Sequence, residues 1–396
     1  MKKITLLMLM SLTAGYMSAQ DRVITTGVPF LQIAADARSA GMGDMGAASS
    51  ADAFSQQHNP AKYAFAIEKQ GVAVSYTPYM ASIANDISLA QLNYYNRINE
   101  RSAFAGSLRY FGLGDIELRN SYEDQARVVS PNELALDGTY ALKLDERFAA
   151  AVTGRYIRSA LKVPDGNTDA SAANTFAFDI SAFYQSEEIA YSEFNGRWRV
   201  GLNLQNLGPK INYNNDGNDE SANFLPSNFK LGAGFDFILD EYNKVSVLAE
   251  INKLMVPSPK EIIPVDIDGD GEISNEEIRT ANSQARSDYN RIGWSSGLFK
   301  SFGDASGGMK EELQEVAWAL GAEYWYQDSF AFRAGYFNEH ELKGARKYAT
   351  IGAGFKYNVV KVDVSYLFST SKVQNPLENT LRFSLTFNFG DSYDEY

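Results

Sequence analysis

The stretch LRFSLTFNF (residues 381–389) places an apolar side chain at every second position, with Arg, Ser, Thr and Asn between them. A period of two indicates a β-strand with one apolar and one polar face. The same alternation recurs at residues 229–237 and 360–368, where the polar face carries full charges such as Lys361 and Asp363. Such a face is too polar for the interior of a small packed sandwich. We therefore expect the apolar side chains to face lipid and the polar ones to line a lumen, as in an outer-membrane barrel.

The alternating pattern continues along the chain and predicts fourteen strands. The fold class expected is all-β, a fourteen-stranded antiparallel outer-membrane β-barrel with long external loops. The predicted strands lie near residues 71–79, 86–95, 101–113, 133–144, 147–161, 174–186, 197–206, 228–240, 243–255, 316–327, 329–338, 348–358, 359–369 and 380–390.

The lengths of the connections agree with this count. Outer-membrane barrels alternate short periplasmic turns with long external loops. With the N-terminus in the periplasm, short turns at 96–100, 145–146, 241–242, 328 and 358–359, and a medium one at 187–196, all fall inside. The long connections then fall outside, at 114–132, 162–173, 207–227, 256–315, 339–347 and 370–379. Segment 291–302 resembles a strand, but counting it would break the alternation, so we place it within the external loop 256–315.

Composition supports a membrane barrel and excludes several functions. The chain has 24 Phe, 23 Tyr and 4 Trp, yet its mean hydropathy is −0.29; a barrel can expose such rings to lipid. Without cysteine it can have no disulfide, thiolate zinc site, cysteine nucleophile or lipidated N-terminal cysteine. A net charge of −13 argues against nucleic acid as a partner.

The first seventy residues divide into two segments. Lys2 and Lys3, the apolar run 4–12 and small residues up to Ala19 are typical of a signal peptide, expected at 1–19. Residues 20–70 lack strand alternation and are rich in Ala, Gly and Ser. A fourteen-stranded barrel is too wide for wall side chains alone to fill, so we expect this segment to be a plug. A periplasmic tail is the alternative. The barrel itself is expected over 71–396.

Catalysis is not expected. The only histidines are His58 and His340, and no serine lies in a G-x-S-x-G motif. We expect structural or solvated roles for both histidines, and pairing within the lumen for the inward-facing Glu323 and Arg333. Gly41, Gly43 and Gly46 match G-x-G-x-x-G only formally, because no strand precedes them; we interpret them as aids to close packing.

Residues 266–277, DIDGDGEISNEE, have the spacing of a calcium-binding loop. Acidic groups stand at positions 1, 3, 5 and 12, a glycine at 6, a glutamate offering its carbonyl at 7 and a serine at 9. Prolines upstream exclude a regular incoming helix, whereas 275–287 could form an outgoing one. The alternative is a solvated acidic loop without metal. The expected Ca²⁺ ligands are Asp266, Asp268, Asp270, Glu272, Ser274 and Glu277.

Several stretches resemble known outer-membrane families. Residues 37–43 (ARSAGMG) and 59–61 (NPA) resemble the start of FadL-like barrels. Residues 321–368 and 375–390, with SFGD at 301–304 and EEL at 311–313, resemble the PorV (LptO) family of the type IX secretion system of Bacteroidota. The resemblance covers essentially the whole mature chain.

The resemblance implies a non-enzymatic outer-membrane component of that system, in contact with outer-membrane lipid and lipopolysaccharide. Members of the family bind the C-terminal signal domain of secreted cargo, collect it from the translocon SprA (Sov) and pass it to the sortase PorU. Two other functions stay open on the residues alone. One is a FadL-like transporter of hydrophobic small molecules, and the other, less favoured, is a lipid-modifying enzyme.

Overall fold

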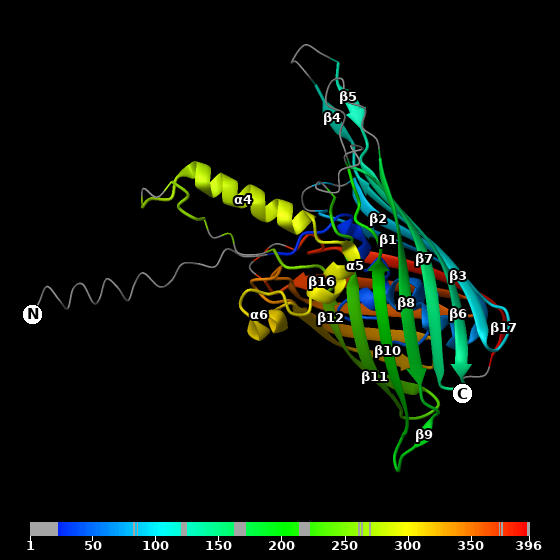
Figure 1. The fold of residues 1–396 in the computed structure, drawn as a ribbon. Helices are drawn as coiled ribbons and strands as arrows, with labels where there is room; N and C mark the ends of the chain where they lie inside the picture. The colour runs from blue at the N-terminus through cyan, green and yellow to red at the C-terminus, as the bar shows by residue number, and fades with distance from the viewer. Residues whose placement is uncertain are drawn as a thin grey trace, which may run out of the picture.

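The computed structural model describes residues 23–393, apart from 82, 83, 85, 120–124, 162–171, 214–221, 260, 261, 263, 269, 270, 372 and 374. The predicted signal peptide 1–19 lies outside the described residues. The described chain forms one large antiparallel sheet that closes on itself, because the first strand, β1, pairs with the last, β17. Figure 1 shows the resulting barrel, with the helices of the longest connection at one end.

The barrel sheet contains fifteen strands in the described residues, but β9 pairs only with β10, so fourteen strands form the closed wall. The wall strands are β1 (Glu68–Pro78), β2 (Ile87–Arg97), β3 (Ser102–Leu113), β6 (Asn132–Asp145), β7 (Phe148–Ala160), β8 (Ala173–Gln185), β10 (Asn195–Leu207), β11 (Asn228–Ile238), β12 (Asn243–Leu254), β13 (Val316–Tyr326), β14 (Phe330–Asn338), β15 (Lys347–Tyr357), β16 (Val360–Ser369) and β17 (Leu381–Ser392).

The predicted fourteen-stranded antiparallel barrel is therefore confirmed, with small differences at the ends of its elements. β1 begins at Glu68, three residues earlier than predicted. The medium turn 187–196 contains β9 (Ile189–Ala190), and the long connection after β3 forms a hairpin of β4 (Ile116–Leu118) and β5 (Arg127–Val129).

The longest connection, between β12 and β13, carries three helices: α4 (Asn275–Asn290), α5 (Trp294–Lys300) and α6 (Met309–Gln314). The strand-like segment 291–302 thus contains a helix and lies outside the wall, as the alternation of loop lengths requires. No helix among the described residues is both long enough and apolar enough to cross a membrane.

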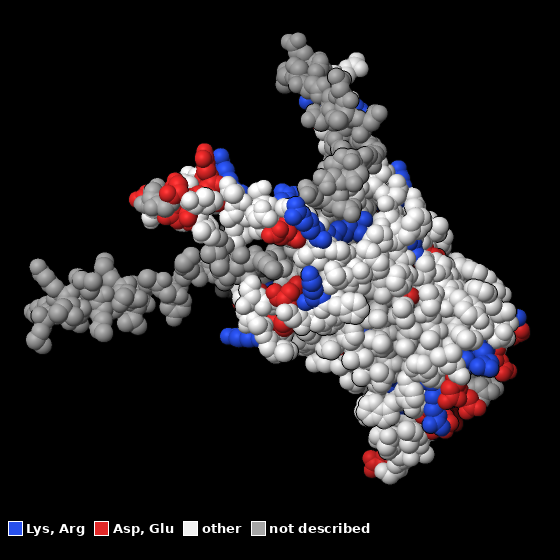
Figure 2. Space-filling model, in the orientation of Figure 1, with Lys and Arg blue, Asp and Glu red and all other residues white. Residues whose placement is uncertain are grey.

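The two faces of the wall have opposite chemistry. Along β17, the side chains of Phe383 and Phe387 are 46% and 40% exposed, whereas those of Arg382 and Ser384 between them are 1% and 2% exposed. Figure 2 shows one outer face of the barrel, on which a broad uncharged surface separates the charged groups that gather toward the two ends. Apolar side chains face outward and polar ones inward, which is the arrangement expected of a barrel in lipid.

Residues 23–67 lie inside the barrel. They form four short helical turns, η1 (Pro29–Gln32), α2 (Ala37–Ala40), α3 (Ser55–His58) and η2 (Pro60–Phe65), which are mostly buried. Near one end, the amide of Gly27 donates to the carbonyl of Phe224 (2.9 Å) in the connection before β11. Near the other end, Arg97 on β2 donates to the carbonyl of Ala66. This lumen segment (residues 23–67) therefore runs from the external mouth to the periplasmic end before β1 begins.

Glycines in the wall let the backbone of the lumen segment approach closely. A Cβ atom at Gly201 on β10 would lie 1.8 Å from the carbonyl oxygen of Ala47, and one at Gly335 on β14 would lie 2.2 Å from the amide nitrogen of Gly43. Both distances are far shorter than any real carbon contact. At these two strand positions a side chain would occupy the space that the lumen segment fills.

Candidate functional site

A chain of buried ion pairs joins the lumen segment to the wall. Arg38 donates to Glu323 on β13 through two nitrogens, at 3.0 and 2.7 Å, and to Asp52 at 2.8 Å. Glu323 also accepts from Arg333 on β14 at 2.6 Å, and Arg333 lies 2.8 Å from Asp363 on β16. The predicted pairing of Glu323 with Arg333 is confirmed. The bonds of Glu323 to Arg38 of the lumen segment were not predicted.

Other wall side chains bind the backbone of the lumen segment. Arg109 on β3 donates to the carbonyls of Phe30, Leu31 and Ile33 at 2.9, 3.1 and 2.7 Å. Across the barrel, Glu250 on β12 accepts from the amides of Gly46 and Ala47 at 3.0 and 2.8 Å. Strands on several sides of the ring therefore supply the partners that this irregular backbone needs.

His58 belongs to the same polar interior. Its Nε2 lies 2.9 Å from Asp36, which also accepts the hydroxyl of Ser39 at 2.7 Å. Asp36 thus separates the imidazole from the serine hydroxyl. His340 uses Nδ1 to accept the amide of Leu342 (3.2 Å). Neither histidine hydrogen-bonds a serine hydroxyl among the described residues, so neither forms a nucleophile–base pair.

The predicted calcium loop is partly assembled. Carboxylate oxygens of Asp266, Asp268 and Glu277 lie within 4.8 Å of one another. Gly271 has φ +85° and donates its amide to Asp266 at 2.8 Å, so this glycine makes the sharp turn that the spacing predicted. Asp270 lies outside the described residues, and the side chain of Glu272 is exposed.

Ser274 and Glu277 together form the start of α4. The Ser274 hydroxyl accepts the Glu277 amide (3.3 Å), and the Glu277 carboxylate accepts the Ser274 amide (2.8 Å), which is a capping box. Hydrogen bonds from the backbone of Ile267 and Ser274 lower the pKa of Glu277 to about 2. The carboxylate is therefore fixed and ionised beside the two aspartates.

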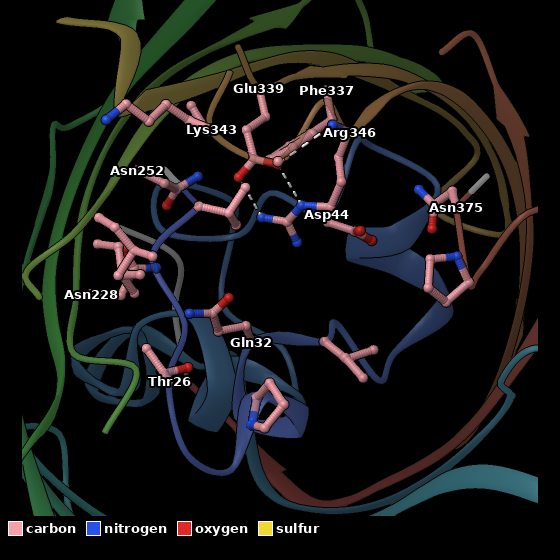
Figure 3. A pocket seen from close by; sticks show the side chains of 18 of the residues that line it. Thr26, Gln32, Asp44, Asn228, Asn252, Phe337, Glu339, Lys343, Arg346 and Asn375 are labelled. Carbon is pink, nitrogen blue, oxygen red and sulfur yellow. Dashed lines mark hydrogen bonds and ion pairs between the residues drawn. The ribbon is translucent and has the colours of Figure 1, made fainter. Parts of the chain in front are cut away.

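A cavity of about 470 Å³ opens at the external mouth, above the lumen segment. Figure 3 shows Gln32 pointing into it from the lumen segment, Asn228 and Asn252 on one side and Asn375 opposite. Its acidic groups already have partners: Glu339 pairs with Arg346 at 2.8 Å, and Asp44 with Arg382 at 2.7 Å. Sequence patterns did not identify this cavity, because its lining comes from segments that lie far apart along the chain.

Comparison with known proteins identifies the family. Residues 16–261 match the model of the family described as type IX secretion system protein PorV. The chain belongs to the PorV family. This PorV family member is therefore an outer-membrane component of the type IX secretion system of a Gram-negative bacterium.

Solved structures of other barrels resemble the chain at low identity. A Pseudomonas aeruginosa FadL homologue is 11% identical with a TM-score of 0.42, covering 90% of this chain and 98% of its own. A TodX mutant titled a monoaromatic hydrocarbon channel is 11% identical (TM-score 0.49; 89% and 99% covered), and the Ralstonia pickettii toluene transporter TbuX is 10% identical (0.45; 91% and 100%). A search of curated protein sequences finds no match to this PorV family member.

Removing one buried carboxylate should loosen the lumen segment. We predict that Glu323→Gln destabilises the folded barrel by about 3–5 kcal/mol, because Arg38 and Arg333 both lose a buried partner. Glu341, an exposed glutamate paired with the half-buried Lys347, offers a matched control, and Glu341→Gln should cost less than about 1 kcal/mol. The measurement is the denaturant midpoint of the folded-to-unfolded band shift on gels, together with tryptic cleavage within residues 23–67. Equal midpoints for the two variants would contradict the prediction.

Proposed function

We propose that this PorV family member binds the C-terminal signal domain of type IX cargo on its external face and carries it from the translocon SprA (Sov) to the sortase PorU. The observation that carries the proposal is the occupied lumen. Residues 23–67 run its length and bond to the wall on several sides. A folded cargo cannot pass through such a barrel, so the surface that remains for a partner is the external mouth and its loops.

The external loops supply a large surface of mixed character. The hairpin β4–β5 and helix α4 both project from the barrel (Figure 1). In the connection that carries α4, apolar side chains on α5 and α6 are strongly exposed, with Phe299 81% and Met309 74% accessible. Exposed apolar patches of this kind in water commonly mark sites of protein interaction. Together with family membership, they support a docking role.

The alternative function, transport of hydrophobic small molecules, fits the described residues less well. Such a transporter needs an apolar pocket beneath the loops and an opening in the wall. The cavity at the mouth has a mixed lining, in which apolar side chains alternate with amides and charged groups, and every neighbouring pair of the fourteen wall strands is hydrogen-bonded over its described residues. An enzymatic role has no support from either histidine, as described above.

Direct binding tests the proposal. We expect the full-length protein in detergent to bind a purified type IX signal domain saturably in biolayer interferometry, and to retain SprA and PorU when isolated from cells. A β-sandwich domain of similar size and charge from a protein that is not type IX cargo is the matched control and should not bind. Recovery of fatty-acid metabolites alone, with no signal domain bound, would favour the transporter instead.

We also propose that residues 266–277 bind one Ca²⁺ ion, which stiffens the longest external connection. The ligands would be the carboxylates of Asp266, Asp268, Asp270 and Glu277, the Glu272 carbonyl and Ser274, directly or through water. The three described carboxylates already converge, and a bound cation would relieve their mutual repulsion. Because Glu277 also begins α4, calcium would fix the direction of that helix.

Calorimetry tests the calcium proposal. We expect one site per chain with a dissociation constant of about 10⁻⁴–10⁻³ M, the range of extracellular calcium modules. Asp266→Ala should abolish the heat and lower hydrogen-exchange protection across 275–290. Glu276→Gln removes an acid from the first turn of α4 outside the proposed ligand set, so it should bind calcium normally. Absence of heat in the wild-type protein, with unchanged exchange in Asp266→Ala, would show that the loop holds no metal.

A further inference from the structure

The cavity at the external mouth has a closed bottom. Gln32, Ile33 and Asp44 of the lumen segment line it from beneath, while wall strands and loops surround it. Beneath these residues the lumen is filled by the rest of the segment, held by Arg109 and Arg38. A chain that enters the cavity must therefore end in it or turn back. Its volume of about 470 Å³ lies within the usual range for small ligands.

One cation in the cavity lining has no acidic partner among the described residues. Glu315 is bonded to Lys253 at 2.6 Å and to Lys343 at 3.0 Å, and the other two acids, Glu339 and Asp44, have the arginine partners given above. Lys230, which also lines the cavity, makes no ion pair or hydrogen bond through its ammonium group with any described residue. It is half-buried on β11. The other two cations of the lining, Lys343 and Arg346, are held by glutamates, so Lys230 is the lining cation that stays available to an anionic ligand.

Other donors point to the same kind of ligand. Arg346 uses Nε and Nη2 for Glu339, and its Nη1 has no hydrogen-bond partner within the described part of the chain. Asn252 lies directly across the strand pair from Lys230. Its Oδ1 is an acceptor that is buried without a hydrogen bond, so it suits a peptide N–H of the ligand and not the carboxylate itself. Gln32 adds a further amide. Amide groups of this kind can bond to the backbone of an extended peptide as well as to a charged end.

We propose that this cavity binds the carboxylate-bearing end of an extended peptide, with Lys230 as the group that neutralises it and the free Nη1 of Arg346 and the amides as supporting donors. The inference rests on the proposed function, since the peptide it implies is the end of a cargo signal domain. A single carboxylate matches a single unpaired cation, and a chain end matches a cavity with a floor. Phe337 and Leu377 in the lining offer apolar contacts for a neighbouring side chain.

The test uses an acetylated, fluorescently labelled pentapeptide with the last five residues of a type IX signal domain, made with a free C-terminal carboxylate and as the amide. With the full-length protein in detergent, we expect the free acid to bind at least tenfold more tightly than the amide in fluorescence anisotropy. Lys230→Met should remove that difference, and Lys230→Arg should restore it. Lys310→Met, an exposed external lysine on α6 that does not line the cavity, should behave as wild type.

Three results would overturn the inference. The first is equal binding of acid and amide, and the second is unchanged selectivity in Lys230→Met. The third is that Lys230→Met no longer binds lipopolysaccharide vesicles but still binds the peptide, which would assign the cavity to a lipid anion.

Binding of the whole signal domain distinguishes failure of this inference from failure of the proposed function. If the domain binds wild type and Lys230→Met equally, only the cavity inference fails; if it binds neither, the proposed function fails as well.

Discussion

The buried ion pairs between Arg38, Glu323, Arg333 and Asp363 are the interaction on which the rest of the structure depends. A wall whose apolar face is turned to lipid must place its charged side chains in the lumen, and buried charges are costly unless each has a partner. Strand residues alone would leave Glu323 with one arginine. The lumen segment supplies a second arginine, Arg38, whose Nη2 lies 2.7 Å from the Glu323 carboxylate. The charged side chains of the wall thus gain partners from the same segment whose backbone the wall holds in place.

This filling of the lumen determines which part of the molecule can act. Residues 23–67 are bonded to β3, β12 and β13 on different sides of the ring. In the function that we propose, the barrel is therefore a rigid support, and the loops and the cavity at the external mouth bind the partner. Family membership assigns the protein to the type IX secretion system. Calcium would act on the same surface by ordering the connection that carries α4, while Lys230 in the cavity would hold the end of the cargo.

Sequence reasoning succeeded where the determining pattern is local. Alternation at 381–389 predicted which residues face lipid, and twelve contiguous residues sufficed to predict the turn at Gly271. It failed where partners are distant: Arg38 and Glu323 are separated by 285 positions, and no periodicity relates them. Residues 294–300 carry apolar side chains that mimic a strand, yet they form α5, and the strands on either side of their connection, β12 and β13, pair directly with each other. Likewise, the sequence does not reveal that Lys230 has no acidic partner among the described residues, because the acids near it come from distant strands and loops and bind other cations.

The central claim is that the lumen segment closes the barrel, so that the protein acts as a docking platform and not as a pore. Ion conductance of the purified, refolded wild-type protein in planar lipid bilayers tests it most directly. The account predicts no steady current above that of the bare bilayer, since residues 23–67 block the lumen from mouth to periplasmic end. A stable, ohmic current of the size given by an open porin would contradict it.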